Sequence, residues 1–346
     1  MLAVAHATGR ASHARKVKGD DPDKKGYPGP PGWGFGLGLT TPHSKKLIVT
    51  KIEQRKKLDR ANDDRNGTRK GTRYTKITLA TWNVQTMLKP GRMEERMEEI
   101  STAKVDVVAL QEIRWQGQGR IDKKDFSLVY NGPKKRTGCY GTVFFINSKM
   151  RKSFLSFEPL SDRLCKLRLR GKFRIITLIS TYTPTEDSPD VIKDEFYDQL
   201  SQECEKAHKY NILILLGDFN ANIGKENFMA AVAGKYTLHE VTSENGKRLG
   251  QLAARHSMII KRTCFEHKRI HKGTRMSPGT DVVNQIDHVV INKGHASSVT
   301  DVKSCHGPCC DSDHFLVKVM LRERLSDALR KQGRKRKRRN IDKLKN

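Results

Sequence analysis

The 346-residue sequence lacks several features that define familiar protein classes. No apolar stretch approaches the roughly 20 residues that a membrane-spanning helix needs. The seven cysteines show no disulfide-scaffold spacing and are odd in number, which in a chain of this size indicates a reducing compartment. Tandem repeats and the Y-x-D-D motif of reverse transcriptases are also missing from the sequence. These absences argue against a membrane-spanning helix, a small disulfide scaffold and a polymerase within this sequence.

Acidic residues are scarce relative to basic ones. The sequence has 67 Lys and Arg against 38 Asp and Glu, a net charge of +29. The excess is densest at the ends: residues 1–75 hold 17 basic and 7 acidic side chains, and residues 321–346 hold 12 and 3. Basic flanks on a basic domain predict a polyanionic partner, most often nucleic acid, although the tails could instead serve only solubility.

Composition divides the chain into three parts. Residues 1–75 are rich in Pro and Gly without an apolar period, which predicts a disordered basic leader rather than a transit peptide. Residues 76–320 carry the regular apolar patterns and are expected to form one domain. Residues 321–346 form a basic tail whose "GRKRKRR" predicts nuclear localisation or a nucleic-acid patch, or else is a solvated charge run.

Short apolar strands alternate with a few helices in the predicted domain. Helices are expected where Met93, Met97 and Ile100 share one face, and where Ile192, Phe196 and Leu200 do so. Strands are expected in "KITLATWNV", "VDVVALQEI", "YGTVFFI", "FRIITLISTYTPT", "NILILLG", "NQIDHVVI" and "DHFLVKVML". This order is typical of an α/β or α+β fold with stacked sheets.

Short polar side chains recur where these strands begin or end. In "ILILLGDFNANIG", Asp218 and Asn220 follow a buried strand and would project together, although they could simply form the turn. Similar positions are held by Asn83, Glu112, Tyr182, Asp287, Asp313 and His314. Loops at one edge of a rigid sheet are where sites are usually built. Carboxylates suit Mg²⁺, and a His beside a carboxylate can stabilise charge on phosphorus.

Six short motifs carry a family resemblance. In chain order, "TWNV", "LQE", "YTPT", "GDFNA", "QIDHV" and "SDHF" resemble the endonuclease/exonuclease/phosphatase superfamily over about residues 76–320. The phrases "LQEIRWQGQGRI", "TSENGKRLGQLAA" and "VTDVKSCHGPCCDSDHFLV" are similar to the endonuclease domain of RTE/BovB-type non-LTR retrotransposons. The resemblance implies a DNase I-like, four-layer α/β sandwich, in which two β-sheets are flanked by helices.

The same resemblance implies the metal site and the water-activating group. Glu112 is expected to be the principal ligand of Mg²⁺, for which Mn²⁺ could substitute, with Asn83 beside it. Asp218 is expected to orient or deprotonate the attacking water, with support from Asn220. Asp313 is expected near the metal or a second metal position.

The remaining implied roles concern the phosphate. Tyr182 is expected near the scissile phosphate, and His314 is expected to contact a phosphate oxygen. Asp287 pairs with that histidine, either raising its pKa or only fixing the orientation of the ring. A zinc site formed by Cys305, Cys309, Cys310 and His314 is the weaker alternative, because the spacing is not C-x-x-C.

Three residues depart from the family pattern. Gln85 stands where AP-endonuclease relatives have a second metal-site Asp, which argues against two metals. Arg275 stands where relatives often have Trp, which could weaken or alter DNA contact. Val143 replaces a common small residue and could disturb packing.

We therefore expect a Mg²⁺-dependent endonuclease that nicks duplex DNA, is nuclear and monomeric, and needs no small-molecule ligand. The alternative is a domesticated, catalytically weak protein that binds nucleic acid or chromatin. Inositol-phosphate or lipid phosphodiesterase activity is a third possibility, which the basic tails and the subgroup phrases disfavour.

Overall fold

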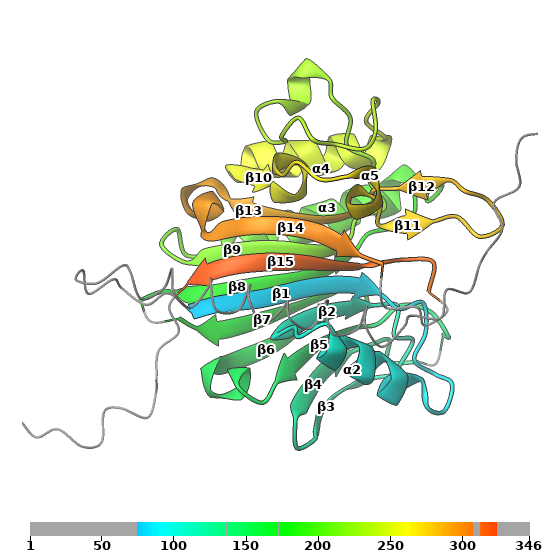
Figure 1. The fold of residues 1–346 in the computed structure, drawn as a ribbon, viewed down its shortest axis with the longest axis vertical. Helices are drawn as coiled ribbons and strands as arrows, with labels where there is room; N and C mark the ends of the chain where they lie inside the picture. The colour runs from blue at the N-terminus through cyan, green and yellow to red at the C-terminus, as the bar shows by residue number, and fades with distance from the viewer. Residues whose placement is uncertain (1–74, 136, 172, 307–311, 324–346) are drawn as a thin grey trace, which may run out of the picture. The chain divides into compact units, whose positions relative to one another are not determined.

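The computed structural model describes residues 75–323, apart from residues 136, 172 and 307–311 (Figure 1). The expected basic leader, most of the basic tail, Cys309 and Cys310 therefore lie outside the described residues. The last strand continues to Glu323, three residues beyond the expected domain end, and its Leu321 is buried. Among the described helices, none combines the length and the apolar character that crossing a membrane requires.

Seven strands form the first sheet, in the order β14–β15–β1–β2–β5–β4–β3. Their bounds are β1 Thr75–Asn83, β2 Val107–Gln111, β3 Gln118–Asp122, β4 Phe126–Asn131, β5 Thr142–Asn147, β14 Val299–Cys305 and β15 Leu316–Glu323. Strands β1 and β2 are parallel, and the other neighbours are antiparallel.

Six strands form the second sheet, in the order β10–β13–β9–β8–β7–β6. Their bounds are β6 Phe154–Ser161, β7 Leu164–Arg170, β8 Ile175–Tyr182, β9 Ile212–Asp218, β10 Met258–Ile260 and β13 Asp287–Asn292. Strands β8 and β9 are parallel, whereas β13 runs antiparallel to β9. A separate two-stranded hairpin joins β11 (Arg275–Met276) to β12 (Val283–Asn284).

Helices cover the outer faces of both sheets, so the described domain has four layers (Figure 1). The helices are α2 Arg92–Thr102, α3 Asp190–Glu205, α4 Glu244–Arg255 and α5 Arg269–Lys272, with 3₁₀ turns η1 Met150–Ser153, η2 Asn227–Met229, η3 Lys261–Cys264 and η4 Lys293–Ser298. Met97 and Ile100 of α2 pack on the first sheet, whereas Leu200 of α3 and Leu249 of α4 pack on the second. The four-layer sandwich expected from the sequence is confirmed.

The core between the sheets consists of apolar side chains from alternate strand positions. Ile212, Ile214 and Leu216 of β9 face this core, because side chains two residues apart point to the same face of a strand. The next residue in that inward row is Asp218, the last residue of β9. The row of buried apolar side chains on β9 therefore ends in the carboxylate of Asp218.

The apolar patterns predicted most of the strands and helices, but one side chain, Ile192, was wrongly expected to be buried. Phe196 and Leu200 of α3 are buried as expected, but Ile192 is 47% exposed. Lys193 and Tyr197 complete the buried face instead, since the aliphatic stem of Lys193 covers apolar surface while its ammonium binds the Glu186 carbonyl oxygen and Asp190. The strands that the sequence did not indicate are β3, β4, β6, β7, β10 and β14, together with the β11–β12 hairpin.

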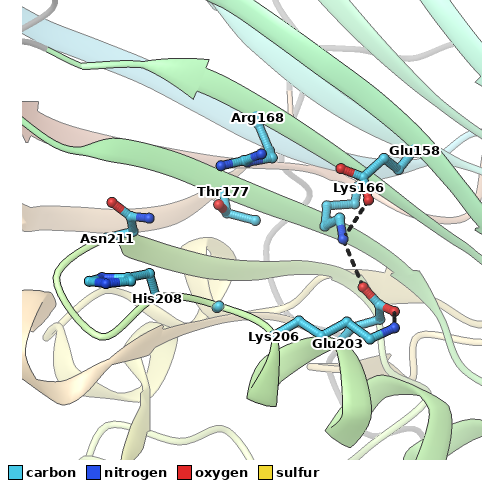
Figure 2. A pocket seen from close by; sticks show the side chains of 9 residues that line it. Glu158, Lys166, Arg168, Thr177, Glu203, Lys206, His208 and Asn211 are labelled. Carbon is cyan, nitrogen blue, oxygen red and sulfur yellow. Dashed lines mark hydrogen bonds and ion pairs between the residues drawn. The ribbon is translucent and has the colours of Figure 1, made fainter.

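Strand β7 alternates between buried apolar residues and charged residues, one of which forms ion pairs. Lys166 of β7 binds Glu158 at 2.7 Å and Glu203 of α3 at 2.9 Å. These ion pairs line a hollow near the start of β8, away from Tyr182 at its end. Arg168 and Asn211 also line it (Figure 2). The hollow therefore belongs to the contact between α3 and the second sheet.

Gly217 is required by the close approach of β8 and β9. It lies opposite Thr181 in the parallel ladder, and a Cβ built at Gly217 would overlap the Thr181 carbonyl oxygen. The obstructing atom belongs to the backbone, so relief requires the strands to move. Because Asp218 follows directly, the same movement would displace its carboxylate.

We predict that Gly217→Ala lowers the free energy of unfolding by about 3 kcal/mol, the cost of forcing atoms into a packed interior. Urea denaturation measures this change. Gly294→Ala is the matched control, because a Cβ at Gly294 meets no atom within 4 Å. That variant should remain within about 0.5 kcal/mol of the wild type. Equal stabilities for the two variants would contradict the steric argument.

Candidate active site

The expected polar strand ends meet at one edge of the two packed sheets. In the first sheet, Asn83 at the end of β1 lies opposite Gln111 at the end of β2. In the second sheet, Asp218 lies opposite both Tyr182 and Asp287. Parallel β8 and β9 end together where antiparallel β13 begins, which is why residues so distant in sequence converge here.

The Asn83 amide joins the two sheets. Its Nδ2 donates to Glu112 Oε1 at 2.8 Å and to Asp218 Oδ2 at 3.0 Å. Its Oδ1 accepts from the Gln85 backbone N–H at 3.0 Å, which determines which way the amide points. Asn83 therefore holds two carboxylates at a defined separation, and in this orientation it acts as a donor to both.

Glu112 follows β2 in a left-handed backbone conformation, with φ of 57°. Its Oε2 lies at a long 3.3 Å from Arg114, its carboxylate also interacts with the Tyr182 hydroxyl, and its side chain is 17% exposed. Four other residues of this region have positive φ without being glycine: Gln85, Arg114, Tyr140 and Asn220. Such backbone conformations cost free energy and concentrate at functional sites.

His314 lies between three carboxylates. Its Nδ1 lies 3.1 Å from Asp287 Oδ2, while its Nε2 lies 3.8 Å from Asp218 Oδ2 and 3.7 Å from Asp313 Oδ1. Asp287 and Asp218 are 0% and 2% exposed, and His314 is 4% exposed. Buried carboxylates are costly without partners, so a cationic imidazole is favoured at this position.

The pKa values of this cluster follow from burial and mutual charge. Burial alone would lower the pKa of His314, but the carboxylates of Asp287, Asp218 and Asp313 outweigh it and raise the pKa to about 9. Burial and then the charge of Asp287 raise the pKa of Asp218 to about 7, although His314, Asn220 and Asn83 partly oppose this. The histidine is therefore a cation and the aspartate is a base near neutrality.

Asn220 supports Asp218 from just beyond the end of the strand. The strand ends at Asp218, and Asn220 adopts φ of 45°, so the two-residue strand period no longer applies. The Asn220 backbone N–H donates to Asp218 Oδ1 at 2.9 Å, and its side-chain amide donates to the Thr183 carbonyl oxygen at 2.9 Å. The expected support of Asp218 by Asn220 is therefore present as a backbone hydrogen bond, while the Asn220 amide bonds to the residue that follows Tyr182.

Tyr182 lies beside the carboxylates, with its ring held by Arg163. The Arg163 guanidinium stacks 4.8 Å from the centre of the Tyr182 ring and 4.2 Å from that of Tyr140. Burial, followed by the charges of Glu112 and Asp218, raises the pKa of Tyr182 well above its usual range. The phenol therefore remains protonated and can donate a hydrogen bond.

Asp313 is occupied by two donors. Gln85 Nε2 donates to Asp313 Oδ1 at 2.6 Å, and Arg275 Nε donates to Oδ2 at 2.8 Å. The two departures from the family pattern therefore meet on one carboxylate. Val143, the third departure, is fully buried in the outer cluster that packs on α2, so its side chain is accommodated.

Several supporting residues were not identified from the sequence. Ser312 Oγ donates to the Asn83 carbonyl oxygen at 2.7 Å and accepts from the His314 N–H at 3.1 Å. Trp82 Nε1 donates to the His314 carbonyl oxygen at 2.9 Å, and Asn245 Nδ2 donates to the Asn220 carbonyl oxygen at 3.1 Å. Each lies in one of the motifs "SDHF", "TWNV" and "TSENGKRLGQLAA", so membership of these motifs was the only sequence signal for their supporting role.

Two places in the site could hold a metal ion: a cluster of three residues and the separate carboxylate of Glu112. Ligand atoms of Asp218, Asp287 and His314 lie within 4.8 Å of one another, and this group contains no cysteine. A cationic His314 would repel a metal there. Glu112 fits better, because it is a hard oxygen donor, keeps accepting capacity at Oε2 and is partly open to solvent.

Comparisons with known proteins agree with this geometry. The model of the Endonuclease/Exonuclease/phosphatase family matches residues 80–314. Craniofacial development protein 2 of Bos taurus is 27% identical over 247 residues, covering 71% of this chain and 41% of that protein. The protein of the same name from Tragulus javanicus is also 27% identical, with 42% of it covered. The chain therefore spans about two fifths of the curated relatives it matches.

Solved structures show the same fold. The AP endonuclease LMAP from Leishmania major has a TM-score of 0.55 at 16% identity, covering 72% of this chain and 88% of that one. The endonuclease domain of TRAS1, a telomere-specific non-LTR retrotransposon, has a TM-score of 0.50 at 15% identity, covering 71% and 98%. The expected resemblance to a retrotransposon endonuclease domain is confirmed at the level of fold.

We predict that Asp287→Asn lowers the pKa of His314 from about 9 toward or below the ordinary value of about 6.5, because it removes the carboxylate 3.1 Å from Nδ1. NMR titration of the imidazole in metal-free protein measures this change. Asp301→Asn is the control, since Asp301 lies 2.8 Å from the ring of a different histidine, His267. An unmoved titration in Asp287→Asn would mean that Asp287 only orients the ring.

Proposed function

The chain belongs to the endonuclease/exonuclease/phosphatase family, and from that premise we propose that it is a Mg²⁺-dependent endonuclease that nicks duplex DNA. The observation that carries the proposal is the Asn83 amide, which joins the Glu112 and Asp218 carboxylates beside the Asp287–His314 pair. This arrangement places a candidate metal ligand, a base and a cation around one small volume. The basic ends of the chain favour a nucleic acid as the substrate.

The chain's own residues supply the proton transfer. Asp218, with a pKa of about 7, takes a proton from the attacking water near neutral pH. The two bonds from Asn83 and Asn220 leave this carboxylate only one orientation, so the base is positioned before substrate binds. Water oxygen then bonds to phosphorus while the bond from phosphorus to the 3′-oxygen breaks, and the 3′-oxygen takes a proton from solvent water to leave a 3′-hydroxyl and a 5′-phosphate.

Charge on the phosphate is stabilised by His314 and Tyr182. The cationic imidazole, held by Asp287, faces the negative charge that develops on the non-bridging oxygens. The protonated Tyr182 phenol donates to the same group of oxygens. Glu112, with Asn83 beside it, would hold Mg²⁺, which supplies a Lewis acid for the phosphate when bound.

Glu112→Gln should abolish nicking of supercoiled plasmid in Mg²⁺, with a loss of at least about a hundredfold, because the ligand charge is removed while the hydrogen bond from Asn83 can persist. Gel analysis of nicked circles measures the rate, and calorimetric titration with Mg²⁺ gives an independent readout. Glu95→Gln is the control, since Glu95 forms an exposed ion pair with Arg92. Full activity in Glu112→Gln would overturn the assignment.

The same assay separates the alternative function. A wild-type protein that binds duplex DNA but does not nick it in Mg²⁺ would be a nucleic-acid-binding protein of this fold. We also propose that the protein is nuclear and monomeric and that its basic tail contacts DNA, because the tail is rich in Lys and Arg.

Removal of residues 324–346 should flatten the dependence of log affinity on log salt, because each phosphate contact contributes a slope of about −0.9 on duplex DNA. Fluorescence anisotropy with a duplex at several salt concentrations measures this slope. A scrambled version of the same segment keeps the charge and should retain the wild-type slope. An unchanged slope after removal would show that the tail does not contact DNA.

A further inference from the structure

Arg275 lies beside the site with most of its hydrogen-bonding capacity unused. Its Nε donates to Asp313 Oδ2 at 2.8 Å, and its side chain is 37% exposed. Within residues 75–323 as described, no bond from the two terminal guanidinium nitrogens is found. An arginine has five N–H donors in a planar fork, so four of them have no acceptor among the described residues.

The backbone places this arginine next to the catalytic histidine. Arg275 forms an antiparallel bridge with His314, which is flanked by hydrogen bonds from Met276 N to Asp313 O at 2.8 Å and from Phe315 N to Thr274 O at 2.7 Å. The guanidinium also lies within electrostatic reach of the buried carboxylates. Partial burial opposes the charge, but Asp313, Asp218 and Asp287 together raise the pKa of Arg275.

Asp313 holds the guanidinium in one orientation. Its Oδ2 accepts a hydrogen bond from Arg275 Nε, and its Oδ1 accepts one from Gln85 Nε2 at 2.6 Å. The carboxylate therefore cannot rotate freely. Asp313 is 8% exposed on its side chain, which limits competition by water. An arginine fixed in this way loses little further rotamer freedom when it binds a ligand.

Resting on the proposed function, we propose that Arg275 binds a phosphate group of the DNA strand at the active site through its terminal guanidinium nitrogens. The guanidinium fork matches two oxygens of one phosphate, which a lysine ammonium cannot do. Asp313 is then a positioning residue for Arg275 rather than a metal ligand, and Gln85 completes the positioning. This chain thereby uses charge at a position where the family resemblance leads us to expect tryptophan.

The test measures DNA affinity without turnover. Fluorescence anisotropy of a labelled duplex in EDTA, at several salt concentrations, compares the wild type with Arg275→Gln and Arg275→Lys. Arg120→Gln is the matched control, because Arg120 Nε also binds an aspartate, Asp122 at 2.9 Å, and its side chain is 45% exposed. Thermal melting of every variant checks that the fold is retained.

We expect Arg275→Gln to weaken affinity about tenfold and to lower the salt slope by about 0.9, the loss of one phosphate contact. Arg275→Lys should keep the slope but lose part of the affinity, since the charge remains and the fork does not. Arg120→Gln should change neither quantity.

An affinity and a slope for Arg275→Gln equal to those of Arg120→Gln would overturn the inference and leave Arg275 as an anchor of the β11–β12 hairpin. Failure of the proposed function looks different. In that case the wild type binds duplex DNA with the Arg275-dependent slope but does not nick it in Mg²⁺. A wild type that binds no duplex DNA would overturn both proposals.

Discussion

The packing of two apolar sheet faces against each other is the constraint on which the site depends. Alternate residues of β1, β2, β8, β9 and β13 fill the space between the sheets, and this core excludes water along most of its length. Toward one edge the inward rows change from apolar to polar, where Gln111 accepts from Thr81 of the same sheet and donates to Ser180 of the other sheet. Glu112 and His314 lie just outside the strands, but Asn83, Tyr182, Asp218 and Asp287 are the next members of these rows. Their positions are therefore set by the core rather than by flexible loops.

This origin explains the electrostatics of the site. Residues that continue a core row remain buried, so Asp218 and Asp287 cannot be stabilised by bulk water. Their stability comes from His314 and from donors such as Asn83, which arrive from the opposite sheet. The same burial raises the pKa of Asp218 and, through the carboxylates, that of His314. At neutral pH, Asp218 can therefore act as a base and His314 carries a positive charge, because these residues lie where the apolar rows of the core end.

The residues that depart from the family pattern are connected to one another in the fold. Gln85 and Arg275 lie far apart in sequence, yet both bind Asp313. Arg275 forms an ion pair with this carboxylate and Gln85 donates a hydrogen bond to it, so both oxygens of a group expected near the metal already have partners. One metal position, at Glu112, is consistent with this arrangement. The Asp218–Asp287–His314 group is compact but carries its own cation, which suits it to the proton transfer and charge stabilisation proposed above better than to holding a metal.

Much of the architecture followed from the sequence alone. Period-two and period-3.6 apolar patterns located the main strands and helices, because burying one face is a local requirement that each segment records in its own residues. The six motifs identified Asn83, Glu112, Tyr182, Asp218, Asp287 and His314, since each ends or begins such a strand. Strand β3 was missed because it has few apolar residues, whereas the alternation in β7 is a strand pattern that the sequence does contain.

Only the tertiary structure decided how those residues act. The orientation of the Asn83 amide, the bond from the Asn220 amide to Thr183, and the pairing of Asp313 with Gln85 and Arg275 all depend on partners distant in the chain. The pKa values are likewise set by burial and by charges from other strands, which no local pattern contains. A sequence records what each segment must bury, whereas hydrogen-bond partners and electrostatic neighbours exist only after the sheets have packed.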